Sequence, residues 1–128
     1  MQLLQVAQHA EDLDRAEAFY ADLLGTAPVA RFDPPGLLFF DLDGVRLLLD
    51  RAAPPALLYL RVDDARDFVD RLRARGVSIE AEARLIHTDT AGDFGEPGTE
   101  EWMGFFRDSE GNVVGCASRH APTPAPPR

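Results

Sequence analysis

The sequence has little of several features that define particular classes of protein. It contains one cysteine, Cys116, so no disulfide can form within the chain, and its apolar surroundings predict a small buried side chain. Its longest apolar runs, such as residues 54–60, are too short to span a bilayer. The first ten residues lack the basic start and the long apolar stretch of a secretory signal. We therefore expect a cytoplasmic protein with no membrane partner.

Basic charge is also scarce. The chain has 13 Lys and Arg residues against 22 Asp and Glu residues, for a net charge of −9. An acidic protein without a basic stripe is repelled by phosphate backbones, so nucleic acid is not an expected partner. A length of 128 residues with 45% hydrophobic residues is typical of one globular domain.

One pattern occurs twice along the chain. Residues 38–49 and residues 104–116 each contain an apolar strand, an acidic turn closed by Gly, and a second apolar strand. A short amphipathic helix precedes each copy: we expect the first to be capped by Asp14 and the second by Asp63 or Asp64. The repetition predicts an α+β fold of two β-α-β-β-β modules, whose curled mixed sheet encloses an open cup.

The boundaries of the modules follow from turns and prolines. We expect a single domain over residues 1–119, with module one at 1–51, module two at 56–119, and a Pro-rich disordered tail at 120–128. The expected helices end at Gly25 and Gly76. Residues 88–100 are expected to form a long irregular loop, either a binding loop or a tolerated insertion. The expected strands outside the two repeats lie at residues 3–8, 29–32, 57–62 and 77–81, and residues 84–86 are a further strand candidate.

Several segments together resemble a known superfamily. Residues 12–25, residues 62–65 with Gly76-Val77, and residues 105–112 resemble the vicinal oxygen chelate superfamily of glyoxalases, bleomycin resistance proteins and extradiol dioxygenases. Residues 105–112 match its closing F-x-D-P-x-G-N turn, with Ser109 in place of Pro. The resemblance implies that the modules form a cup in which catalytic members bind a divalent metal, with one ligand from each of four strands. It also implies a homodimer.

The four implied ligand positions are mostly occupied by side chains that cannot bind a metal. They fall on Gln5, on Arg46 or Leu48, on Leu57, and on Gly115. Aliphatic side chains and glycine offer no lone pair, and a guanidinium repels a cation, whereas a stable site needs three or more protein donors. We therefore expect neither the usual metal site nor another cofactor.

Strand alternation predicts what lines the cup instead. If Leu58 and Leu60 pack under the second helix, then Tyr59 and Arg61 face the other way, toward the cup. An apolar lining with guanidinium groups suits an aromatic or acyl ligand that carries a carboxylate or phosphate. Alternatively, Arg46 and Arg61 lie near strand ends and reach solvent. The candidate ligand-binding residues are Gln5, Arg46, Leu48, Leu57, Tyr59, Arg61, Trp102 and Gly115.

Two further residues are candidates for catalysis. His87 could act as a general base beside a carbonyl, with Glu101 as its carboxylate partner or as a base itself. Alternatively, His87 is a structural residue and Glu101 is a solvated acid. His9 could join Gln5, His87 and Glu101 in an atypical metal site, which would indicate a metal-dependent lyase, an epimerase-like isomerase or a dioxygenase.

We favour a glyoxalase-like or bleomycin-resistance-like domain that binds a small organic ligand without the usual metal. The metal-dependent enzyme is the alternative, and a domain that regulates a partner protein is a third possibility. Composition and motifs leave open whether the protein is an enzyme.

Overall fold

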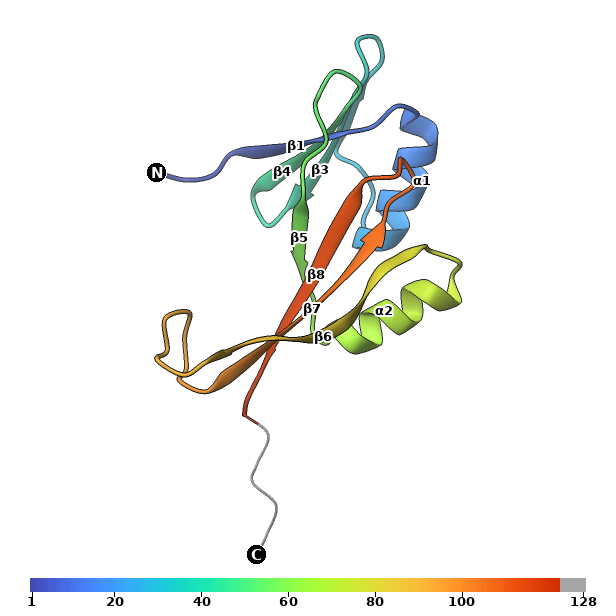
Figure 1. The fold of residues 1–128 in the computed structure, drawn as a ribbon. Coiled ribbons are helices and arrows are strands. Elements are labelled where there is room, and N and C mark those ends of the chain that lie inside the picture. The colour runs from blue at the N-terminus through green and yellow to red at the C-terminus, as the bar shows by residue number, and fades with distance from the viewer. Residues whose placement is uncertain (123–128) are drawn as a thin grey trace, which may run out of the picture. The chain divides into compact units, whose positions relative to one another are not determined.

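The computed structural model describes residues 1–122, and residues 123–128 of the predicted tail lie outside the described residues. The chain folds as two compact units, each with a four-stranded mixed sheet and one helix (Figure 1). Among the described residues, unit 1 comprises 1–57 and 108–112, and unit 2 comprises 58–107 and 113–122. The predicted repetition of a β-α-β-β-β module is confirmed. The elements are β1 (Gln5–His9), α1 (Leu13–Leu24), β2 (Ala30–Phe32), β3 (Leu37–Leu42), β4 (Val45–Asp50), β5 (Leu58–Arg61), α2 (Ala65–Ala74), β6 (Ile79–Asp89), β7 (Thr99–Arg107) and β8 (Val113–His120).

In unit 1 the strand order is β1-β4-β3-β2, with β1 and β4 parallel and the other pairs antiparallel. The β3–β4 hairpin turns at Asp43 and Gly44, which have φ angles of 52° and 88°. Two successive residues with positive φ fit the twist of a two-residue hairpin, as the Asp-Gly pair predicts. The fully buried apolar side chains of this unit are Ala10, Leu13, Ala16, Tyr20, Leu38, Phe40 and Leu49.

Helix α1 begins two residues earlier than the sequence suggested. The Asp12 carboxylate accepts a hydrogen bond from the amide of Arg15 at 3.1 Å, so Asp12 and not Asp14 is the N-cap. Asp14 lies in the first turn, where its negative charge interacts favourably with the helix dipole. The helix ends as predicted at Gly25, whose φ of 68° is left-handed.

The segment 108–112, which joins β7 to β8, belongs to unit 1 and is attached to α1 and β1 by buried polar groups. The Tyr20 hydroxyl donates to the Asp108 carboxylate at 2.6 Å, and the Asn112 amide donates to the carbonyl of His9 at 2.8 Å. Burial and the Asp108 charge together raise the pKa of the Tyr20 phenol far above its usual value, so the hydroxyl stays protonated. This long-range network completes the hydrogen bonding of a loop that has no sheet partner.

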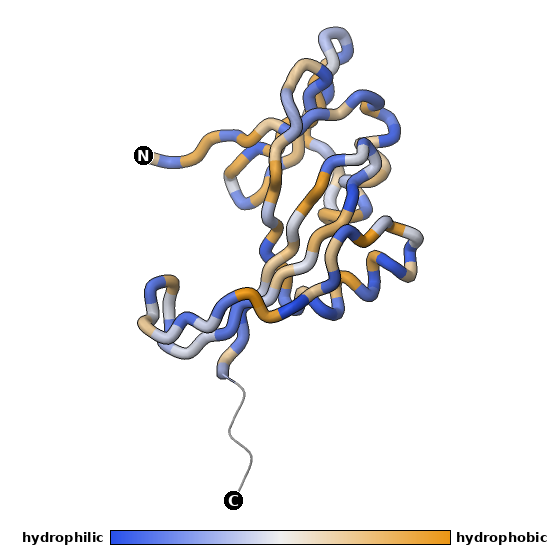
Figure 2. The backbone as a smooth tube through the Cα atoms, in the orientation of Figure 1, coloured by the Kyte–Doolittle hydropathy of each residue, from blue (hydrophilic) through white to orange (hydrophobic). Residues whose placement is uncertain are grey.

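In unit 2 the strand order is β5-β8-β7-β6, and α2 lies along one face of the sheet (Figure 1). Asp64 caps α2 by accepting from the amide of Arg66 at 2.9 Å, which confirms one of the two expected caps. Hydrophobic and hydrophilic residues alternate along the helix (Figure 2), and its apolar side meets the sheet through Val69 and Phe68. Gly104 permits this approach, because a Cβ there would lie 2.6 Å from Val69 Cγ2. Cys116 is buried, as predicted, and burial raises the pKa of its thiol.

Strand β6 is a single strand of residues Ile79–Asp89 rather than two short strands. Its pairing with β7 shifts register three times, and these irregularities interrupt the alternation that would have revealed one strand in the sequence. The irregular loop is therefore shorter than expected. Strand β8 also extends to His120, one residue into the expected tail, and the His120 ring lies 2.8 Å from the Ser118 hydroxyl.

No helix among the described residues is long and apolar enough to cross a membrane.

Candidate functional site

Each sheet has one face that packs on its helix and one face opposite to it, which we call the helix-free face. In unit 2, cross-strand register groups the side chains of the helix-free face into rows, because paired residues point to the same side. The three central rows are Tyr59–Gly115–Phe105, Arg61–Ala117–Met103–Arg84, and Arg119–Glu101–His87. The predicted facing of Tyr59 and Arg61 agrees with this register. Arg84 and Met103 were not anticipated, because the broken alternation of β6 hid the direction of the Arg84 side chain.

The first row forms an aromatic surface. The Tyr59 and Phe105 rings meet edge to face, with centroids 5.9 Å apart and planes at 79°. Gly115 lies between them, and a Cβ there would be 2.9 Å from Tyr59 Cδ1 and 3.0 Å from Phe105 Cε1. The space that a side chain at position 115 would need is thus filled by aromatic carbon. Tyr59 is 55% exposed, which leaves part of the pair accessible.

His87 and Glu101 are directly paired between β6 and β7, so both side chains lie on the helix-free face. Glu101 is a strand residue and not part of the loop. The His87 ring makes an edge-on contact with the Phe94 ring, at 6.2 Å between centroids. An imidazole and a carboxylate side by side on one surface are suited to proton transfer.

The loop after β6 is anchored to this same face of unit 2. The buried Asp89 carboxylate accepts from the amides of Asp93 and Phe94 at 2.8 and 2.9 Å, and Arg119 donates to it at 3.1 Å. The Phe94 amide contributes most to holding the pKa of Asp89 below its usual value. Arg119 also donates to the Phe94 carbonyl. These bonds fix the position of Phe94 beside His87.

In unit 1 the helix-free face carries Gln5, Arg46 and Leu48. Gln5 is paired with Arg46, and the Arg46 guanidinium lies 5.6 Å from the centroid of the Phe39 ring. Leu48 is paired with Phe39 and is only 7% exposed. This surface combines apolar side chains with the exposed Arg46 and with the exposed Asp41, which is paired with Arg46 across β3 and β4.

Two predicted ligand-binding residues lie elsewhere. Trp102 is on the helix side of the unit 2 sheet, where the Arg66 guanidinium stacks 4.3 Å from its ring centroid. It differs from Phe105 by three positions, so alternation places the two rings on opposite faces. Leu57 precedes β5, belongs to unit 1 and is 50% exposed.

The family's metal does not fit the donors at the four implied positions. Gln5 offers one amide oxygen, Arg46 and Leu48 offer none, and Gly115 is enclosed by carbon. His9 is already engaged, with Nδ1 2.9 Å from the Ala53 carbonyl oxygen and Nε2 3.6 Å from the Glu11 carboxylate. Among residues 1–122, no three His, Cys, Asp or Glu side chains group closely enough to bind a metal ion. The donor set therefore differs from that of a metal-binding member.

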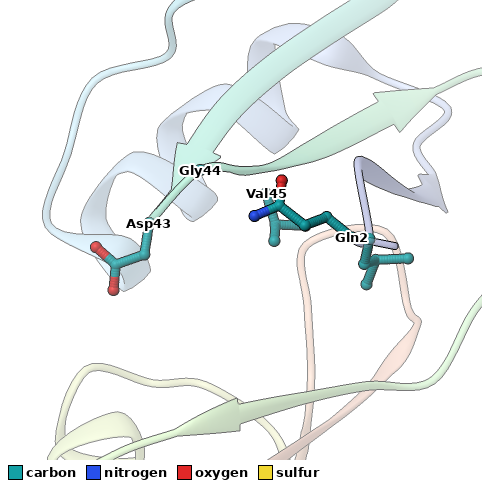
Figure 3. Close-up of a pocket in the computed structure, with 5 residues that line it drawn as sticks. Gln2, Asp43, Gly44 and Val45 are labelled. Carbon is teal, nitrogen blue, oxygen red and sulfur yellow. The ribbon is translucent and has the colours of Figure 1, made fainter.

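A small depression of about 240 Å³ lies in unit 1 beside the β3–β4 turn (Figure 3). It is lined by Gln2, Leu3, Asp43, Gly44 and Val45. None of the predicted site residues is among them, and a single carboxylate with an amide indicates no particular chemistry.

Comparison with solved structures places this fold among known proteins. The chain resembles lactoylglutathione lyase from Agrobacterium tumefaciens (24% identity, TM-score 0.66, covering 91% of this chain and 92% of that one). It also resembles TnmS3, an antibiotic binding protein from Streptomyces sp. CB03234 (24%, 0.65, 94% and 97%), and a glyoxalase-related enzyme from Fulvimarina pelagi (19%, 0.67, 91% and 87%). At these identities the likeness establishes the fold alone.

No curated protein matches the chain. The model of the Glyoxalase/Bleomycin resistance protein/Dioxygenase superfamily matches residues 2–116, nearly the whole chain. The duplicated module and the matched length agree with the resemblance found in the sequence. The protein therefore belongs to the glyoxalase/bleomycin resistance protein/dioxygenase superfamily.

Proposed function

We propose that this protein binds a small organic molecule with a flat aromatic or acyl part and an anionic group, and that it does so without a metal. The observation that carries the proposal is the Tyr59–Phe105 pair over Gly115. Where the family resemblance implies a metal ligand at position 115, this chain presents the aromatic carbon of Tyr59 and Phe105. An exposed edge-to-face pair favours a flat apolar group through area burial and ring contacts.

A cationic side chain near the aromatic surface accounts for the anionic part of the ligand. Arg61 lies one row from Tyr59 on the same face of unit 2. A guanidinium binds a carboxylate or phosphate through two parallel hydrogen bonds. The similar antibiotic binding protein supports the idea that this fold can bind a small molecule.

Acid–base catalysis is the second candidate, and the pairing of His87 with Glu101 on one face favours it. In that case the protein would be a lyase or an epimerase-like isomerase, whereas a dioxygenase would also need the atypical metal site. Assays with the hemithioacetal of methylglyoxal and with methylmalonyl-CoA test this candidate. Turnover that is lost in His87→Gln would support it, and no turnover with either substrate would count against it.

The proposal also includes a homodimer in the cytoplasm, which rests on the family resemblance and on composition. Leu85 and Ile86 are 42% and 43% exposed on the edge strand β6, where a second copy could cover them. Light scattering after size exclusion measures the mass directly, and a monomer would contradict the dimer.

The binding proposal is tested by titrating phenyl phosphate, phenylacetate and neutral benzyl alcohol into protein purified without chelator. We expect the aromatic anions to bind, and Tyr59→Ala to weaken them while Trp102→Phe, on the other face, leaves them unchanged. Metal analysis of the same sample is expected to give far less than one ion per chain. Stoichiometric zinc, nickel, cobalt or iron, or the absence of any binding, would contradict the proposal.

A further inference from the structure

Two arginines of unit 2 differ from most of the others in the protein. In a chain with 22 acidic residues, most arginines of the described part are ion-paired, for example Arg15 with Glu110 and Arg71 with Asp67. Within residues 1–122 no carboxylate lies within ion-pair distance of Arg61 or Arg84, and both residues are exposed. In an acidic protein, unpaired guanidinium groups leave strong hydrogen-bond donors available.

These two arginines lie at the ends of one row. The row runs across four strands, from Arg61 of β5 through Ala117 of β8 and Met103 of β7 to Arg84 of β6, and each residue is paired with the next. Adjacent strands are about 4.8 Å apart, so the two Cα atoms are separated by about 14 Å. Long side chains from both ends can therefore reach a group above the small Ala117 and the flexible Met103 between them.

The neighbouring rows restrict where an anion can lie. The other two arginines of this face are already neutralised, since Arg107 pairs with Glu80 and Arg119 pairs with Asp89. Glu101 occupies the row beyond and repels an anion there. On the other side, the Tyr59–Phe105 pair offers aromatic carbon and one phenol hydroxyl, but no positive charge. The row with Arg61 and Arg84 is thus the part of this face most favourable to an oxyanion.

We propose that Arg61 and Arg84 together bind the oxyanion of the ligand, a carboxylate or phosphate, above Ala117 and Met103, while the flat part of the same ligand packs on Tyr59 and Phe105. This inference rests on the proposed function and extends it. It adds Arg84 as a residue that determines specificity, and it places the two parts of the ligand on two adjacent rows of side chains. The expected ligand class is an aromatic or acyl carboxylate or phosphate monoester.

The test compares Arg61→Gln and Arg84→Gln with Arg71→Gln, which removes the same charge from the exposed surface of α2. Calorimetry with phenyl phosphate and with phenylacetate measures the affinity for a phosphate and for a carboxylate separately. Benzyl alcohol has no charge, so it measures the contribution of the ring contact alone. We expect each of the first two variants to weaken both anions by about 10- to 100-fold, since a hydrogen bond to a charged group contributes strongly. Arg71→Gln should bind like wild type, and benzyl alcohol should bind all three variants equally.

Two further variants distinguish the possible failures. Arg84→Lys keeps the charge but loses the two-pronged geometry, so it should bind more weakly than wild type and more tightly than Arg84→Gln. If Arg84→Gln binds the anions as Arg71→Gln does, while Tyr59→Ala still weakens binding, the arginine pair is refuted and the proposed function stands. If no probe binds wild type, both are refuted. Unchanged melting temperatures confirm that the exposed substitutions do not unfold the protein.

Discussion

The attachment of segment 108–112 to α1 should make the protein sensitive to acid. The Glu110 side chain is only 1% exposed. It accepts two hydrogen bonds from Arg15, at 2.8 and 3.0 Å, and one from the Asp12 amide at 2.9 Å. Burial by itself raises the pKa of Glu110, but these donors outweigh burial and lower it from 4.5 to about 2.

The shift sets both the size and the direction of the effect. A carboxyl whose pKa is lower in the folded state stabilises the fold above its unfolded pKa, and it loses that contribution as the pH falls to its folded pKa. The stabilising contribution of Glu110 is therefore lost as the pH falls from about 4.5 to about 2. One pKa unit corresponds to about 1.4 kcal/mol, so the contribution at neutral pH is about 3 kcal/mol.

Urea unfolding of wild type and Glu110→Gln across this range measures the effect. The difference between their free energies of unfolding should shrink by about 3 kcal/mol between neutral pH and about pH 2. Asp33, Asp64 and Asp89 also have lowered pKa values, but they are present in both proteins and their effects cancel. A difference that stays constant with pH would refute this reasoning.

Three substitutions give independent checks. Tyr20→Phe removes the buried hydroxyl that donates to Asp108, so thermal or urea unfolding should show a loss of about 1–3 kcal/mol; no loss would contradict the role of this bond. Gly104→Ala places a methyl group 2.6 Å from Val69 Cγ2, so the free energy of unfolding should fall by about 1–3 kcal/mol in the same assay. Gly44→Ala is the control, because no atom lies near the Cβ position of Gly44 and only backbone strain should appear. Gly115→Ala pushes apart the rings of Tyr59 and Phe105, so calorimetry should show phenyl phosphate binding about 10-fold more weakly. The melting temperature should change little. An unchanged affinity would mean that the rings are not the ligand surface.

Local signals in the sequence predicted most of the fold. Gly25, Asp64 and the Asp43-Gly44 turn each act within a few residues, and the structure confirms all three. The first cap was misplaced because Asp12 and Asp14 are both acceptable N-caps, and the choice depends on which carboxylate reaches the Arg15 amide. Strand β6 was divided in two because its bulges break the period of two on which strand prediction depends.

The candidate site was harder to predict, because it depends on pairing between distant strands. Alternation within β5 was enough to place Tyr59 and Arg61. Placing Arg84 required the register between β6 and β7, and placing Trp102 required knowing which face of β7 meets α2. The attachment of residues 108–112 to Tyr20 joins parts of the chain 88 residues apart, which no local pattern reveals.

The most direct test of the account is the affinity for phenyl phosphate of protein treated with EDTA, compared with the same protein resupplied with zinc. Because the surface offers aromatic rings and guanidinium groups in place of metal donors, we predict the same affinity in both samples. Binding that appears only after one equivalent of a divalent ion has been taken up would contradict the account.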